Sequence, residues 1–296
     1  MRKPVAIVTV LVAIAVIVVS IVFLRGGFSG SSGPDAAPKP PPKPYEVRPD
    51  RDRLGVIADE KADYRARVEG IRKLSTRLRQ KLVLDALKVL DDPKVNESIR
   101  NDLLTKLEQQ EKPSGLLGPE LVRMRNDAGQ TPKWRNYCLQ HMAPVWEVEP
   151  DNRRVLEATL LDVAGREKGV DAETALISLE KIGRKDPKVA ARVRDLARTA
   201  LENRANDPEK AVAAMQVLTS AGDKSVLQEA RQLAVDKKAP SRLRMSAMAV
   251  LGSMGDRNDE KVLSELARTT RSRLKTAAEL NLKALQKRLG PERGDS

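Results

Sequence analysis

A short leucine-containing motif that ends in glycine recurs in the second half of the chain. It constrains the fold more than any other feature. Ala247–Asp256 has the pattern of a helix end, a glycine stop at Gly255 and an aspartate that starts the next helix. Leu179–Gly183 and Leu218–Asp223 repeat it upstream, so the three glycines lie 39 and then 33 residues apart. A period of this length made of two helices predicts an α-solenoid, in which neighbouring helical pairs bury each other's apolar faces.

The composition favours the same fold class. The 296 residues include only two Phe, two Trp and three Tyr, so the core must be built from Leu, Val, Ile and Ala, which suits thin helical pairs. From Arg51 onward apolar residues recur at spacings of three and four, and no stretch alternates as a strand would. We therefore expect an all-α body.

The N-terminus carries a predicted membrane anchor. Val5–Leu24 is a run of 20 residues with nothing more polar than Thr9 and Ser20. At ~1.5 Å per residue a helix of that length spans ~30 Å, the thickness of a bilayer core. The run is longer than the ~7–15 apolar residues of a cleaved signal peptide, and Phe23-Leu24-Arg25 is a poor cleavage site. Residues 1–25 are therefore predicted to be an uncleaved transmembrane signal anchor.

Flanking charge predicts the orientation of this anchor. Arg2 and Lys3 precede the apolar run, and Arg25 alone closely follows it. The positive-inside rule then places the N-terminus in the cytoplasm and the C-terminal body outside it, near a bacterial cell envelope.

Residues 26–50 are predicted to be a disordered linker. Glycine and serine dominate its first part and seven prolines its second part. Such a segment forms no core, and its proline part favours a semi-rigid polyproline II spacer. A proline-rich ligand for an SH3-like domain is the alternative interpretation.

Prolines mark several helix starts in the body. Asp92-Pro93, Thr131-Pro132, Asp186-Pro187 and Asp207-Pro208 each place a capping side chain before a proline, which suits the first helical position. The predicted helices are Leu54–Leu74, Leu78–Leu90, Pro93–Gln110, Pro119–Asn126, Pro132–Trp146, Asp151–Arg166, Ala172–Ile182, Pro187–Asn203, Pro208–Ala221, Lys224–Val235, Ser241–Met254, Asp259–Thr270 and Arg273–Leu289.

Over Ala172–Leu289 the chain resembles the HEAT and HEAT-like repeat family. Each unit has a first helix rich in small residues that ends in Leu-x-x-hydrophobic-Gly, a short turn with an aspartate, and a second helix. We expect HEAT-like repeats over residues 131–290, a helical N-terminal part over 51–130 and a disordered tail over 291–296. The resemblance implies an interaction scaffold rather than an enzyme.

Basic residues provide the candidate binding surface. The net charge is +13, and residues 51–296 carry 48 Lys or Arg against 38 Asp or Glu, which favours an acidic partner. Second helices of such repeats often line the concave face, so we expect an electropositive stripe there. A solvated face without a dedicated partner is the alternative. The candidate binding residues are Arg194, Arg198, Lys261, Arg268, Arg271 and Arg273.

One segment gathers unusual residues. Trp134–Met142 contains the only cysteine, Cys138, and the only histidine, His141. At a spacing of three on a helix these two side chains can be neighbours, as a nucleophile and its base would be. A bulky core face is the preferred interpretation. With one histidine and one cysteine the sequence predicts no metal, no cofactor and no small-molecule substrate.

Three functions follow from these features. The first is a single-pass, membrane-anchored, non-catalytic scaffold that binds a protein, expected to be acidic, or an anionic surface. The second is nucleic-acid binding, because some HEAT-like proteins are DNA alkylation-repair glycosylases with a basic groove; the anchor opposes it. The third is an enzyme that uses Cys138 and His141.

Overall fold

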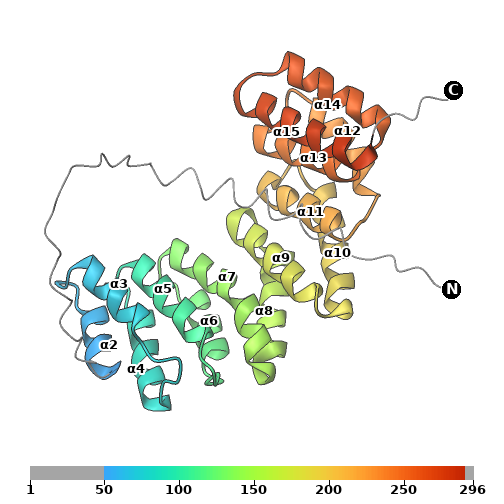
Figure 1. The fold of residues 1–296 in the computed structure, drawn as a ribbon. Coiled ribbons are helices and arrows are strands. Elements are labelled where there is room, and N and C mark those ends of the chain that lie inside the picture. The colour runs from blue at the N-terminus through green and yellow to red at the C-terminus, as the bar shows by residue number, and fades with distance from the viewer. Residues whose placement is uncertain (1–49, 291–296) are drawn as a thin grey trace, which may run out of the picture. The chain divides into compact units, whose positions relative to one another are not determined.

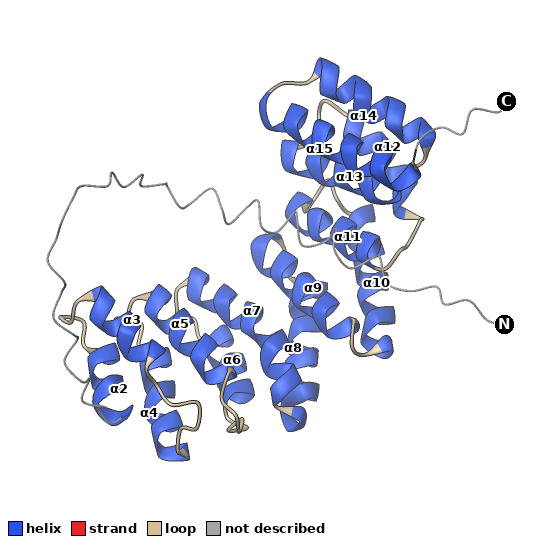
Figure 2. Ribbon diagram, in the orientation of Figure 1, coloured by secondary structure: helices blue, strands red, loops and turns tan. Residues whose placement is uncertain are grey.

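The computed structural model describes residues 50–290, and the predicted anchor, nearly all of the linker and the C-terminal tail lie outside them. Within this range every regular element is helical and no strand occurs (Figures 1 and 2), which confirms the all-α prediction. No helix in the described range is long and apolar enough to cross a bilayer. The helices are α2 (Asp50–Ala58), α3 (Tyr64–Arg72), α4 (Gln80–Asp91), α5 (Glu97–Glu108), α6 (Leu117–Asn126), α7 (Pro132–Val148), the 3-10 helix η1 (Pro150–Asn152), α8 (Arg153–Arg166), α9 (Gly169–Gly183), α10 (Pro187–Glu202), α11 (Pro208–Ser220), α12 (Val226–Val235), α13 (Ser241–Met254), α14 (Arg257–Thr269) and α15 (Ser272–Leu289).

The helices pack in two rows. Substantial contacts join each helix only to its neighbours and next-but-one neighbours in the chain, as expected for a solenoid. Odd-numbered helices form a continuous row from α3 to α15, each packed on the next odd helix. Even-numbered helices do so only from α2 to α8, and no comparable packing joins α8 to α10, α10 to α12 or α12 to α14. The even row is therefore open in the C-terminal half.

The repeating pair is shifted by one helix from the expected unit. The sequence pattern suggests that the glycine-ended helices α9, α11 and α13 come first in each pair. In the structure α12 packs extensively on α13 and only slightly on α11, and α14 packs more on α15 than on α13. The even helix therefore precedes its odd partner in each pair.

Most of the proline-marked helix starts are confirmed. The side chains of Thr131, Asp186 and Asp207 accept hydrogen bonds from backbone N–H groups in the first turns of α7, α10 and α11. The expectation for Asp92-Pro93 was wrong, because α5 begins at Glu97 and Asn96 caps it. Asp92 instead accepts a hydrogen bond from the N–H of Lys94, which stabilises a turn before the helix.

The predicted helix Leu54–Leu74 consists of two helices. The chain leaves α2 after Ala58, and α3 begins at Tyr64, where the Asp63 side chain accepts hydrogen bonds from the N–H groups of Arg65 and Ala66. In between, Asp59 accepts a hydrogen bond from the N–H of Lys61. These local bonds compete with the helical ladder and end α2.

Buried arginines connect the two helices of several pairs. Arg67, Arg100 and Arg244 occupy the fourth position of α3, α5 and α13. Each Nε donates a hydrogen bond to the carbonyl of the penultimate residue of the preceding helix, which is Ile57 (2.8 Å), Leu90 (2.6 Å) or Ala234 (3.3 Å). A helix C-terminus has unsatisfied carbonyls and attracts cations, so these arginines fix the hairpins.

The glycines of the sequence pattern serve two different purposes. Gly222 has φ +68°, a left-handed conformation that favours glycine. Gly255 instead permits a close approach, because a Cβ there would lie 2.4 Å from the Leu251 carbonyl oxygen and 2.7 Å from Asp259 Oδ2. Beside it, Asp256 and Asp259 form a reciprocal capping box at the start of α14, as expected for a helix cap.

Candidate functional site

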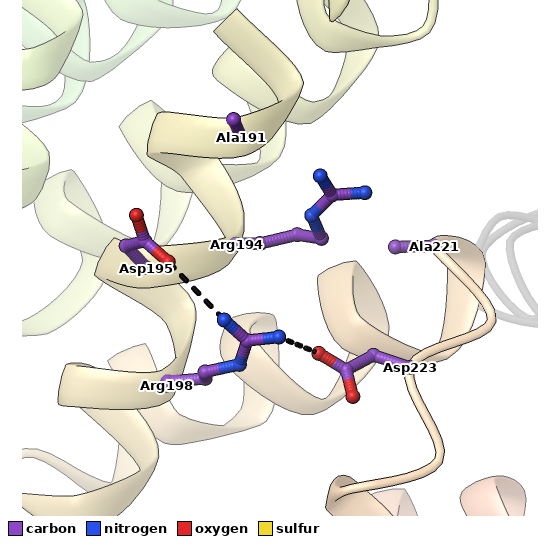
Figure 3. Close-up of a pocket in the computed structure, with 6 residues that line it drawn as sticks. All are labelled: Ala191, Arg194, Asp195, Arg198, Ala221 and Asp223. Atoms are coloured by element: carbon purple, nitrogen blue, oxygen red, sulfur yellow. Dashed lines mark hydrogen bonds and ion pairs between the residues drawn. The ribbon is translucent and has the colours of Figure 1, made fainter.

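An open cleft lies between α10 and the turn that leads from α11 to α12 (Figure 3). Its volume is about 270 Å³, and it is lined by Ala191, Arg194, Asp195, Arg198, Ala221 and Asp223. We call it the α10–α12 cleft. It lies in the part of the array where α10 and α12 lack the packing that joins the even helices from α2 to α8.

The helical period of α10 turns its arginines toward this cleft. Val189, Val193 and Ala197 are buried against the neighbouring helices. Arg194 and Arg198, four residues apart, lie on another face of the same helix and both line the cleft. The structure therefore brings these two candidate residues together in the lining of one cleft.

Arg198 is already paired within the cleft. Its Nη1 lies 3.2 Å from Asp195 Oδ1, and its Nη2 lies 2.6 Å from Asp223 Oδ2 (Figure 3). The hydrogen bond from Ser225, together with Arg198 and against the effect of burial, lowers the pKa of Asp223, which stays ionised. The positive charge of Arg198 is thus balanced by two carboxylates.

Arg194 differs from Arg198 in its surroundings. It is half-buried and lines the cleft, and no ion pair connects it to another side chain in the described range. In Figure 3 its guanidinium points away from the two aspartates. A planar guanidinium of this kind can donate two parallel hydrogen bonds to an incoming carboxylate. Arg194 is therefore the residue best placed to bind an acidic group.

The other predicted binding residues lie on α14, on α15 and, for Arg271, in the turn between them. Arg268 forms an i,i+3 ion pair with Glu265 at 2.8 Å. Lys261, Arg271 and Arg273 are exposed and have no ion pair within residues 50–290. No packing joins α14 to α10. The single electropositive stripe that the sequence suggested is thus divided into two groups on separate helices.

A second cleft, which the sequence analysis did not identify, lies where α8, the end of α7 and the start of α10 meet. It has a volume of about 390 Å³ and includes Arg153, Arg154, Arg192, Trp146 and Leu161 in its lining. We call it the α8–α10 cleft. The Arg153 guanidinium carbon lies 4.4 Å from the centroid of the Trp146 ring, and Arg192 Nη1 lies 2.9 Å from Glu157 Oε1. The available signal was the repeat itself, which places α8 and α10 in equivalent positions.

The cysteine and the histidine of α7 serve other contacts. His141 Nδ1 lies 2.6 Å from Glu108 Oε1, and its Nε2 lies 2.9 Å from Asn101 Oδ1, so both ring nitrogens are engaged with α5. Cys138 is fully buried, and burial raises the pKa of its thiol to about 12. The structure does not bring the two groups together as a nucleophile and its base, and the segment packs as a core face.

Burial of Cys138 makes its reactivity a direct test of this packing. At pH 8 the native full chain is expected to resist alkylation by iodoacetamide, because the thiolate is the reacting form and the thiol is both inaccessible and protonated. Denaturation in guanidinium is expected to give complete alkylation, measured by the mass of the intact protein. Rapid labelling of the folded chain would contradict the position of Cys138.

No family model, no curated protein and no solved structure matches the chain. Within residues 50–290 no group of His, Cys, Asp and Glu side chains could hold a metal ion. The function must be argued from the clefts themselves.

Proposed function

We propose that the protein is a membrane-anchored, non-catalytic scaffold of HEAT-like repeats that binds an acidic segment of a partner protein in the α10–α12 cleft. The observation that carries this proposal is Arg194, whose guanidinium has no ion pair within residues 50–290 and lines an open cleft beside an arginine already neutralised by Asp195 and Asp223. The paired side chains fix the geometry of the cleft, and Arg194 supplies the charge that a ligand carboxylate would neutralise.

The apolar run Val5–Leu24 supports the membrane part of the proposal. It is long enough to span a bilayer, and the proline-rich residues after it suit a spacer between the bilayer and the repeats. In the proposed orientation the repeats lie outside the cytoplasm. Extraction of cell membranes at alkaline pH should leave the full chain in the membrane pellet, with the intact mass of an unprocessed protein. Release into the supernatant would contradict the anchor.

The cleft fits a protein carboxylate better than a nucleic acid. Asp195 and Asp223 both pair with Arg198, which leaves Arg194 as the one cation in the lining of the α10–α12 cleft without an ion pair in the described range. Nucleic-acid sites gain affinity by neutralising many phosphates with many cations, and this lining offers one guanidinium without an ion pair in the described range. A single carboxylate needs no more than that one guanidinium.

Substitution of Arg194 tests the proposal. The probe is a fluorescein-labelled poly-glutamate peptide, titrated with the detergent-solubilised full chain and followed by anisotropy. Arg194→Ala is expected to weaken binding by about 10-fold, because a hydrogen bond to a charged group contributes about 1.5–3 kcal/mol. The matched control is Arg65→Ala, since Arg65 is exposed on α3 and has no ion pair in the described range.

Two results would contradict the proposed function. Equal affinities of the unchanged chain and of Arg194→Ala for the poly-glutamate peptide would show that Arg194 does not contribute to the binding site. Binding of a short DNA duplex that is tighter than binding of poly-glutamate and falls steeply with salt would favour the nucleic-acid alternative instead.

A further inference from the structure

The two clefts occupy the same position in successive repeats. Adding the same number to the residue numbers of five lining residues of the α8–α10 cleft gives five lining residues of the α10–α12 cleft. It carries Arg154 to Ala191, Glu157 to Arg194, Ala158 to Asp195, Leu161 to Arg198 and Asp186 to Asp223. The clefts are thus adjacent copies of one feature of the open even row.

Helix α10 forms part of both clefts. Arg192 lines the α8–α10 cleft, whereas Ala191 and Arg194 line the α10–α12 cleft. These residues lie within one turn of the same helix. A ligand that contacts Arg194 therefore has to pass only α10 to reach the second cleft.

The α8–α10 cleft has a different lining. It contains Trp146, Ala158 and Leu161, so part of its surface is apolar. Arg153 covers the Trp146 ring and donates its Nε hydrogen bond to the Trp146 carbonyl at 3.0 Å. Arg154 is exposed, lines the cleft and has no ion pair within residues 50–290. An apolar side chain against Ala158 and Leu161, above the buried Trp146, and a carboxylate at Arg154 would match this lining.

We propose that the α8–α10 cleft is a second subsite for the same acidic peptide that the α10–α12 cleft binds, and that it selects an apolar residue next to an acidic one. The inference rests on the proposed function, because it assumes a carboxylate at Arg194. The ligand is an extended segment in which acidic residues alternate with apolar ones. A carboxylate bound at Arg194 and a second at Arg154 make its binding bivalent.

The test uses two labelled peptides of about ten residues, which extend over ~33 Å and can pass one helix. One alternates Glu with Leu, and the other alternates Glu with Ser. The detergent-solubilised full chain is titrated against each, by anisotropy and by tryptophan fluorescence. We expect the Glu/Leu peptide to bind about 10-fold tighter and to change the emission of Trp146, an effect that Trp146→Phe removes.

Matched variants separate the inference from the proposed function. Arg154→Ala and Arg194→Ala are each expected to weaken the Glu/Leu peptide by about 10-fold. Arg166→Ala is the control, because Arg166 lies on α8 outside the cleft and its only ion pair among the described residues is the exposed one with Asp162. If Arg194→Ala lowers the affinity for the Glu/Leu peptide and Arg154→Ala does not, the second subsite is overturned and the proposed function stands. If neither variant lowers the affinity, both the second subsite and the proposed function are overturned. If Arg154→Ala alone lowers it, the bivalent site is overturned.

Discussion

Arg100→Ala is expected to destabilise the α4–α7 part of the repeat array by about 3–5 kcal/mol. Arg100 is fully buried, and it donates hydrogen bonds to the Leu90 carbonyl at 2.6 Å and to Gln130 Oε1 at 2.7 Å. Its guanidinium carbon lies 3.8 Å from the centroid of the Trp134 ring. Alanine would leave the buried Leu90 carbonyl and Gln130 Oε1 without a donor and would create a cavity beside the Trp134 ring.

One opposing effect reduces this loss without reversing it. Burial desolvates the charged guanidinium of Arg100 and lowers its pKa to about 10. Removing the charge relieves that cost. The unpaired acceptors and the cavity still dominate, because each stranded buried acceptor costs about 1–3 kcal/mol.

Hydrogen exchange measured by mass spectrometry is the suitable readout, because repeats can open separately and a single melting temperature would average them. Peptides from α4, α5 and α7 of Arg100→Ala should exchange at least about 100-fold faster than in the unchanged chain, and peptides from α13 should not. Arg65→Ala is the control, with an expected change within about 0.5 kcal/mol. Unchanged protection around Trp134 would contradict the assigned role of Arg100.

Asp259→Ala is expected to destabilise the junction of α12 and α14 by about 2–4 kcal/mol. Asp259 is 1% exposed and accepts a hydrogen bond from the N–H of Asp256 at 2.8 Å, which is half of the capping box. It also accepts two hydrogen bonds from Arg231, at 2.7 and 2.8 Å. The substitution removes the cap and the link between the two helices together.

The effect of Asp259→Ala should depend on pH. Burial raises the pKa of this carboxyl, but the hydrogen bonds from Arg231 and from the Asp256 backbone outweigh it, so the native pKa lies below its ordinary value. A lowered native pKa contributes stability above the unfolded-state pKa of about 4 and loses it as the pH falls through the native value. The difference between the variant and the unchanged chain should therefore be full at pH 7 and shrink below about pH 4.

Local hydrogen exchange of α12 and α14 at pH 7, together with acid unfolding followed by circular dichroism, measures both effects. Glu265→Ala provides the control, because the Glu265–Arg268 pair is exposed on the same helix and should contribute less than about 1 kcal/mol. Equal stabilities of Asp259→Ala and Glu265→Ala would contradict the account of the capping box.

Sequence patterns predicted the elements whose causes are local. The bounds of α13 agree with the predicted Ser241–Met254, because a regular apolar period lies between Pro240 and Gly255. Thr131, Asp186 and Asp207 were recognisable as caps, because capping depends on a few adjacent residues.

Features that depend on packing were not predictable in the same way. An arginine in the first turn of a helix looks alike whether it is buried or exposed, so Arg67, Arg100 and Arg244 gave no signal individually. Arg135 occupies the same position of α7, yet its Nε has no hydrogen-bond partner among residues 50–290. The pairing of helices and the opening of the even row likewise depend on contacts between repeats.

The candidate site shows the same division between local spacing and packing. Helical spacing placed Arg194 and Arg198 together, because residues four apart share a face. The spacing did not show that Asp195 and Asp223 neutralise Arg198 and leave Arg194 without an ion pair in the described range. Asp223 lies far from α10 in the sequence, in the turn between α11 and α12. The α8–α10 cleft became visible only when equivalent positions in successive repeats were compared.

Charge reversal at Arg194 tests the central claim most directly. The full chain and Arg194→Glu are each titrated with a Glu-rich and a Lys-rich peptide of equal length, at the same salt concentration. We predict that the preference for the Glu-rich peptide is strong in the unchanged chain and falls by at least about 10-fold in Arg194→Glu, because the charge that faces the ligand in the α10–α12 cleft then has the opposite sign. The same preference in both proteins would show that Arg194 does not select the ligand and would contradict the account.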